Sequence, residues 1–162
     1  MTAQPNVIPP HGGYAKLKSF QMAEIVCDGT VVFCERFIDQ HSRMHDQMIQ
    51  AARSGRRNIA EGSQAGDTSK KNELKLVGVA RGSFEELLLD YYDFLRQHNL
   101  PTWGKDHPEA KEVRRLGRLA DRSYRTYSAY FSVGSPEVAA NTLICLICQT
   151  NYLLDQQLCR LE

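Results

Sequence analysis

The stretch from Thr68 to Asn99 contains a seven-residue apolar pattern, and this pattern constrains the fold more than any other feature of the sequence. Its members alternate between three- and four-residue steps, which is the spacing of one helical face. They are Leu74, Val77, Arg81, Phe84, Leu88, Tyr91 and Leu95, and Arg81 alone among them is charged. Thr68 or Ser69 can cap the start, and Pro101 follows the expected end near Asn99. The pattern predicts a long helix that packs against others.

Three further segments have helical spacing. The first runs from Leu17 to about Ile38 and has apolar residues on more than one side, which favours an oligomer. The second follows the capping residue Ser42 and runs to about Gly62. The last begins after Ser135 and Pro136 and has a leucine-rich stripe that reaches Leu161. No strand candidate competes with these helices, so we predict four long helices and no sheet.

Small residues interrupt the apolar faces of the first two long helices. Gly29 lies in the middle of the first, where glycine costs roughly 1 kcal/mol relative to alanine unless a neighbour requires a close approach. The face of the second has small side chains in its middle, at Ala51, Ala52 and Gly55. Such a face lets another backbone come near. We therefore expect close helix packing at these positions.

Residues 1–13 and 100–135 lie outside the long helical pattern. The first stretch contains prolines and glycines without a periodic apolar face, so we expect an irregular arm. The second is expected to hold a loop and one short amphipathic helix that starts at Pro108 and includes Val113 and Leu116. With 162 residues, the chain is expected to form a single domain, residues 1–162. The predicted fold is all-α, an up-and-down antiparallel four-helix bundle with an extra short helix inserted before the last long helix.

The composition limits the classes of function. The formal net charge is +1, so any attraction to nucleic acid or to membranes must come from local patches. Five cysteines lie in apolar helical segments, and their odd number argues against a disulfide framework. No segment approaches the roughly 20 apolar residues of a membrane span, and the N-terminus lacks the pattern of a signal peptide. We expect a cytoplasmic protein with reduced thiols and no membrane contact.

Polar residues lie among the small and apolar residues of the second and third long helices. Glu61 and Arg81 are the charged exceptions there. An ion pair between them would offset the cost of burying either charge alone, with Asn58, Ser83 or Glu86 as additional partners. We expect these residues to form a structural network that links the two helices, because neither a nucleophile nor a metal site is evident beside them.

The segment from Asp46 to Gly62, which ends in Asn58-Ile59-Ala60-Glu61-Gly62, is followed by Ala80-Arg81-Gly82-Ser83 and Glu86. Together these motifs resemble a bacterial four-helix-bundle family. The family includes the proteins encoded in intervening sequences of large-subunit ribosomal RNA genes and the accessory variability determinants of diversity-generating retroelements. The resemblance covers residues 14–97 and the final helix. The long segment 100–135 is similar to the longer branch with a four-helix-bundle suffix region.

The resemblance implies an antiparallel bundle that assembles as a ring of five subunits with a central channel. For the retroelement branch it also implies nucleic-acid binding and a partnership with a reverse transcriptase. We therefore expect a homo-oligomer, a pentamer, whose partners are RNA or DNA and a reverse transcriptase or another protein encoded in the same operon.

Two groups of basic residues are candidates for nucleic-acid binding. The first surrounds the end of the second long helix and the start of the third, and consists of Arg53, Arg56, Arg57, Lys70, Lys71 and Lys75. The second recurs at three- and four-residue steps, with Tyr124 and Tyr127 nearby to stack on bases, and consists of Arg114, Arg115, Arg118, Arg122 and Arg125. For both groups the alternative is an ordinary solvated face, favoured for the second by interleaved acidic residues.

These patches predict a non-enzymatic homo-oligomer that binds nucleic acid or a nucleoprotein partner. One alternative is a protein assembly scaffold that binds no nucleic acid. A second alternative is a metal-independent ribonuclease, because Arg36 and His41, with four residues between them, are similar to the motif of helical ribonucleases of the higher-eukaryote and prokaryote nucleotide-binding class. In such an enzyme His41 would transfer protons and Arg36 would stabilise the phosphorane.

Metal and cofactor sites are not predicted. His41 and His45 have a chelating spacing, but no third ligand lies at a suitable distance in the sequence. Cys145 and Cys148 have the spacing of a redox motif, yet they lie within an apolar helical run rather than after a strand, so we expect them to be core cysteines.

Overall fold

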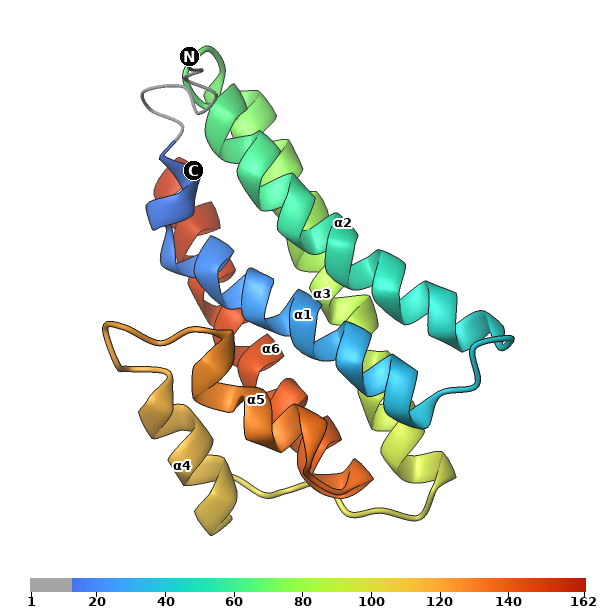
Figure 1. Ribbon diagram of the computed structural model, residues 1–162. Helices are drawn as coiled ribbons and strands as arrows, with labels where there is room; N and C mark the ends of the chain where they lie inside the picture. Colours follow the sequence, from blue (N-terminus) through green and yellow to red (C-terminus); the bar gives the residue numbers. More distant parts are fainter. Residues whose placement is uncertain (1–12) are drawn as a thin grey trace, which may run out of the picture.

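The computed structural model describes residues 13–162, so the predicted irregular arm lies outside the described residues except for Gly13. The described part is all-helical and contains no strand, as predicted for the fold class. Its long helices are α1 (Lys18–Phe37), α2 (Arg43–Ala65), α3 (Lys70–Gln97) and α6 (Pro136–Leu161), with a short 3-10 turn (Tyr14–Lys16) before α1. Successive long helices run in opposite directions (Figure 1). α1 packs against α2, α2 against α3, α3 against α6, and α6 against α1.

Side-chain caps mark the starts of α2 and α3. The hydroxyl of Ser42 accepts a hydrogen bond from the backbone N–H of His45 at 3.2 Å. The hydroxyl of Ser69 accepts one from the backbone N–H of Asn72 at 3.1 Å, so Ser69 rather than Thr68 is the cap of α3. These bonds satisfy backbone donors that a helix leaves unpaired at its first turn.

Residues 100–135 contain two short helices, where the sequence pattern predicted one. α4 (Pro108–Leu116) begins at the expected proline, and α5 (Tyr124–Ser132) is additional. A capping box formed by Ser123 and Thr126 starts α5, and its Tyr127 and Phe131, four residues apart, are fully buried. Tyr124, Tyr127 and Phe131 recur at three- and four-residue steps, which is the sequence signal for this additional helix. In the structure, α5 packs on α1 and α6, and α4 packs on α6.

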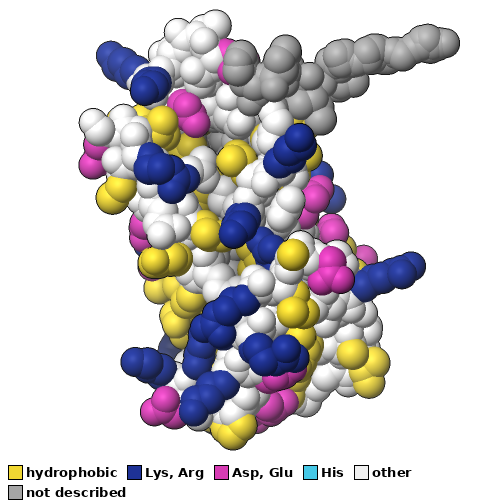
Figure 2. All heavy atoms as spheres, turned by 90° about the vertical axis from the view of Figure 1, so that its left-hand side faces the viewer, with side chains coloured by type: hydrophobic (Ala, Val, Ile, Leu, Met, Phe, Trp, Pro, Cys, Tyr) yellow, Lys and Arg dark blue, Asp and Glu magenta, His cyan; other side chains and the backbone are white. Residues whose placement is uncertain are grey.

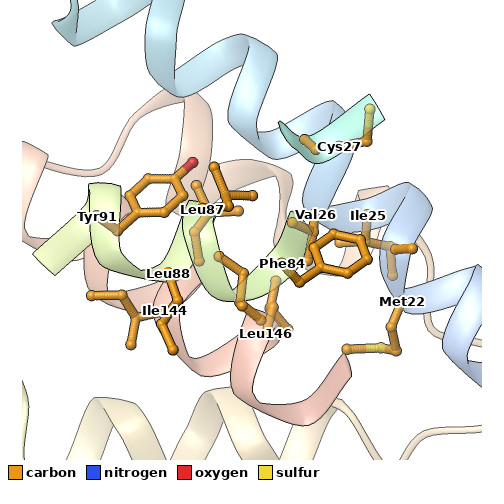
Figure 3. Close-up of a cluster of buried hydrophobic side chains, with 14 of the residues drawn as sticks. Met22, Ile25, Val26, Cys27, Phe84, Leu87, Leu88, Tyr91, Ile144 and Leu146 are labelled. Carbon is orange, nitrogen blue, oxygen red and sulfur yellow. The ribbon is translucent and has the colours of Figure 1, made fainter. Parts of the chain in front are cut away.

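The core lies between the four long helices. Figure 3 shows Val26 of α1, Phe84 and Tyr91 of α3 and Leu146 of α6 directed into one cluster, and all four side chains are fully buried. The phenol of Tyr91 lies 2.8 Å from the hydroxyl of Thr30, so its polar atom is hydrogen-bonded inside the core. Burial of these side chains is the main stabilising contribution to the fold.

Close helix packing at glycines is confirmed. A Cβ atom placed on Gly55 would lie 2.5 Å from ring atoms of Phe84, and one on Gly29 would lie 2.9 Å from Leu143 and Phe131. Both distances are too short for carbon atoms. The two glycines are therefore required by neighbours that contact the helix backbone, which offsets their low helix propensity.

The cysteines of the described chain are all free thiols. Cys27 and Cys34 are buried in α1, whereas Cys148 and Cys159 are exposed on α6. The prediction that Cys148 is a core cysteine is therefore wrong. Burial raises the pKa of the Cys34 thiol to about 12. Among residues 13–162, no helix has both the length and the apolar character that a membrane span requires.

The contact between Gly55 and Phe84 can be tested by a double-mutant cycle. Gly55→Ala should lower the free energy of unfolding by about 1–3 kcal/mol, because the added methyl group overlaps a buried ring. Phe84→Leu removes the overlapping atoms, so the double variant should be destabilised by less than the sum of the two single effects. Urea denaturation followed by circular dichroism measures all three values. Additive effects would show that the methyl group and the ring do not meet.

Candidate nucleic-acid interface

Part of the first basic group lines a groove between α1 and α2. Its volume is about 580 Å³, and α2 contributes Arg53, Arg56, Arg57 and Ala60 to its lining. The remaining lining residues precede or belong to α1 and are Tyr14, Phe20, Cys27, Asp28 and Val31. Arginines at spacings of three and four residues lie on neighbouring turns of one helix. The groove therefore presents a row of guanidinium groups above a partly apolar floor.

The three arginines differ in how they are held. The guanidinium of Arg56 donates to the carboxylate of Glu24 at 3.1 Å and lies 5.5 Å from the ring centre of Phe20. Arg53 and Arg57 are exposed, and neither makes a hydrogen bond or an ion pair within the part of the chain that the structure describes. Arg56 is thus fixed by α1, while the other two remain available to an anionic ligand.

The α1 side of the groove is acidic. Burial raises the pKa of Asp28, the nearby Glu24 raises it further, and Arg56 opposes the change. Burial and the charge of Asp28 also raise the pKa of the Cys27 thiol, although Arg56 and Arg53 lower it. Cys27 is therefore a neutral thiol near pH 7 and not an activated nucleophile.

The lysines of the first basic group lie elsewhere. Lys70, Lys71 and Lys75 are exposed in the first turns of α3, and none of them lines the groove. The structure thus brings the arginines of this group together and separates them from the lysines. The division follows from the fold, because Arg53 and Arg56 face α1 whereas the lysines belong to α3.

The second basic group is largely engaged by neighbouring residues. The guanidinium of Arg115 donates to both carboxylate oxygens of Glu112, at 3.0 and 2.7 Å, and Arg114 donates to the backbone carbonyl of Lys105 at 2.5 Å. Figure 2 shows Lys and Arg side chains mixed with Asp and Glu side chains over the face that includes α4. This mixture is typical of a solvated surface.

The aromatic part of the second group does not face solvent as a stacking site would. Tyr127 is fully buried, and Tyr124 is half-buried. Arg122 lies with its Nε atom 3.1 Å from the sulfur of Met22, so it covers the core, while Arg118 is exposed. The prediction that Tyr127 stacks on bases is therefore wrong, because its ring packs in the helical core.

The predicted ion pair between Glu61 and Arg81 is not formed. Arg81 donates to Asp155 of α6 and to Glu85 of its own helix, both at 2.8 Å. Burial lowers the pKa of Arg81, but the hydrogen bonds and the charges of Glu85 and Asp155 together outweigh this effect and raise it. Glu61 is exposed on α2. Arg81 lies on the side of α3 that faces α6, so it links α3 to α6 rather than to α2.

One uncharged member of the expected network, Ser83, does link α3 to α2, and Asn58 bonds within α2 to the serine that Ser83 contacts. The hydroxyls of Ser54 and Ser83 lie 2.9 Å apart, and the amide of Asn58 donates to the carbonyl of Ser54 at 2.9 Å. Glu86 is exposed and makes no hydrogen bond or ion pair within residues 13–162. Ser54 was not predicted to belong to this network, although it lies four residues before Asn58 on the same helical face.

The two residues of the ribonuclease alternative make no hydrogen bond to each other within residues 13–162. Arg36 donates to the backbone carbonyls of Phe131 and Gly134, at 2.6 and 2.9 Å, and so caps the end of α5. His41 is exposed in the connection between α1 and α2, where its backbone N–H bonds to Asp39. No group of three or more His, Cys, Asp or Glu side chains within residues 13–162 is arranged to hold a metal ion.

The α1 side of the groove was not identified from the sequence. Phe20, Glu24, Asp28 and Val31 recur at three- and four-residue steps, so they share one side of α1 with Cys27. That periodicity was the available signal. The signal is weak because the residues mix apolar and acidic types, and the sequence does not show which side of α1 faces α2.

Comparison with protein-family models, with curated proteins and with solved structures gives no match to this chain.

The alternative partners of Arg81 can be distinguished by two isosteric substitutions. Asp155→Asn should lower the free energy of unfolding by up to about 1 kcal/mol, because it weakens a partly exposed ion pair. Glu61→Gln should change it by less than about 0.5 kcal/mol, as expected for an exposed site. Both are measured by urea denaturation. A larger destabilisation by Glu61→Gln than by Asp155→Asn would contradict the pairing described above.

Proposed function

We propose that this protein is a non-enzymatic homo-oligomer that binds nucleic acid through the groove between α1 and α2. The observation that carries the proposal is the presence of Arg53 and Arg57, both exposed and without a partner in the described chain, in the same groove as Arg56. Unpaired guanidinium groups on one helix face can contact successive phosphates. Repetition of the groove in every subunit of an oligomer would multiply this weak attraction.

We propose an up-and-down four-helix bundle as the architecture of the subunit and a ring of five as the assembly, with a reverse transcriptase or another operon-encoded protein as a partner. The opposite directions of successive long helices and their cyclic contacts support the bundle. The proposed number of subunits and the protein partner rest on the family resemblance of residues 14–97.

An exposed strip on α3 supports self-association and also favours the second candidate, an assembly scaffold. Leu89 is 53% exposed and Val79 is 45% exposed on this helix. Gly78 and Gly82 have open space where a Cβ atom would lie, so no contact within the subunit requires a glycine there. Each costs roughly 1 kcal/mol relative to alanine in a helix interior. A contact with another chain would account for that cost.

Salt dependence of binding tests the role of the groove. Arg53→Ala combined with Arg57→Ala should reduce the slope of log K against log salt by about 0.7 for each phosphate of a single strand that these arginines neutralise. The measurement is fluorescence anisotropy with labelled RNA and DNA across a salt series. Arg118→Ala combined with Arg125→Ala removes the same charge from the other basic group and should leave the slope unchanged. Salt-insensitive absence of binding in the parent protein would favour the scaffold instead.

Light scattering tests the assembly. The parent protein should have a molar mass near five times the 18.4 kDa of one chain. Leu89→Lys places a charge in the exposed strip and should lower the mass, because a desolvated lysine opposes a close helix contact. The substitution lies at an exposed position, so the helical circular dichroism spectrum should be retained. A monomeric parent protein at the concentrations used would contradict the ring.

A further inference from the structure

The two walls of the groove between α1 and α2 have opposite charge. α2 contributes the guanidinium groups of Arg53, Arg56 and Arg57, whereas α1 contributes the carboxylate of Asp28 and, beside it, that of Glu24. A purely anionic ligand would be attracted by one wall and repelled by the other. The groove therefore fits a ligand that has a negative group at one end and a hydrogen-bond donor at the other.

The floor of the groove is aromatic and apolar. Tyr14 and Phe20 lie edge to face, with ring centres 4.9 Å apart, and Arg56 lies over the Phe20 ring. Val31 and Ala60 complete the apolar lining. Aromatic rings and arginine planes are the surfaces on which proteins stack bases.

A nucleic-acid duplex does not match this arrangement. A duplex exposes base edges in its grooves, but the faces of its bases are stacked on neighbouring bases and cannot lie on an aromatic ring of the protein. Phosphates approaching the groove would meet Asp28 and Glu24 as well as the arginines. An unpaired nucleotide has the required polarity, because its phosphate is anionic and the exocyclic amino group of cytosine, adenine or guanine is a donor at the opposite end.

We propose that the groove binds an unpaired, amino-bearing base of a single-stranded nucleic acid, with Asp28 accepting a hydrogen bond from the amino group and Arg53 and Arg57 contacting the adjoining phosphates. The base stacks on the half-buried ring of Tyr14. Arg56, which Glu24 holds over the buried Phe20 ring, lies beside the base. This inference rests on the proposed function, because it assigns the class of nucleic acid and the orientation of the nucleotide at the same groove.

The electrostatic state of Asp28 is consistent with that role. Partial burial and Glu24 raise its pKa, whereas Arg56 opposes this change, and the carboxylate remains exposed to a ligand. Asp28 makes no hydrogen bond or ion pair among the described residues. Asp28 can therefore accept a hydrogen bond from a bound base.

Cytidine and uridine oligonucleotides of equal length provide a matched test, because cytosine has a 4-amino donor at the position where uracil has the O4 acceptor, and the donor of uracil is instead its N3–H. Fluorescence anisotropy at neutral pH should show at least about fivefold tighter binding of oligocytidine than of oligouridine. Asp28→Ala should abolish this preference. Glu35→Ala removes the same charge from an exposed position of α1 outside the groove, and it should retain the preference.

Further binding measurements separate the contribution of base stacking from those of the strand and of its phosphates. Tyr14→Leu should weaken the binding of both oligonucleotides by about fivefold and leave the binding of an abasic strand of equal phosphate number unaffected. Free cytidine monophosphate should compete only weakly, and competition as strong as that of the oligonucleotide would overturn the assignment to a strand. Equal binding of cytidine, uridine and abasic strands would overturn this inference, and so would a preference that survives Asp28→Ala.

These outcomes are distinguishable from a failure of the proposed function. If Arg53→Ala with Arg57→Ala reduces binding but no base preference exists, nucleic-acid binding stands and the base site is refuted. If the parent protein binds none of the strands at low salt, both are refuted.

Discussion

The ring of Phe84 lies against the backbone of α2 at Gly55, and the arrangement of the other helices depends on this contact. Because Gly55 has no side chain, α2 and α3 approach closely enough for Ser54 and Ser83 to bond across the interface. Close packing of these two helices fixes how α2 is rotated about its axis. The side of α2 that includes Arg53 and Arg56 then faces α1, where the groove forms.

The opposite charges of the groove follow from helix geometry. On an amphipathic helix, the residues next to the apolar stripe lie at the boundary between core and solvent. Arg56 and Ala60 occupy that boundary on α2, and Glu24 and Asp28 occupy it on α1. Packing two such helices places their boundary residues opposite each other. The ion pair between Arg56 and Glu24 fixes one arginine and leaves the rest of the groove open to a polar ligand.

The candidate site could be predicted only in part. The arginines of α2 are visible in the sequence as a basic cluster, but their separation from Lys70, Lys71 and Lys75 is not. The pairing of Arg81 with Asp155 was also hidden, because the two residues are 74 positions apart and the sequence does not show which helix lies beside each face of α3. Side-chain spacing defines the faces of one helix, whereas the partner of each face depends on the packing of all four.

The sequence by itself determined the helical class, the four long segments, the serine caps and the positions where a glycine permits close contact, because each depends on residues within a few turns. Tertiary structure decided the rest. It buried Tyr127 in α5, joined Arg36 to the end of that helix, directed Arg81 to α6, and placed Asp28 opposite the arginines of α2. Those outcomes required contacts between segments far apart in the chain, which local periodicity does not encode.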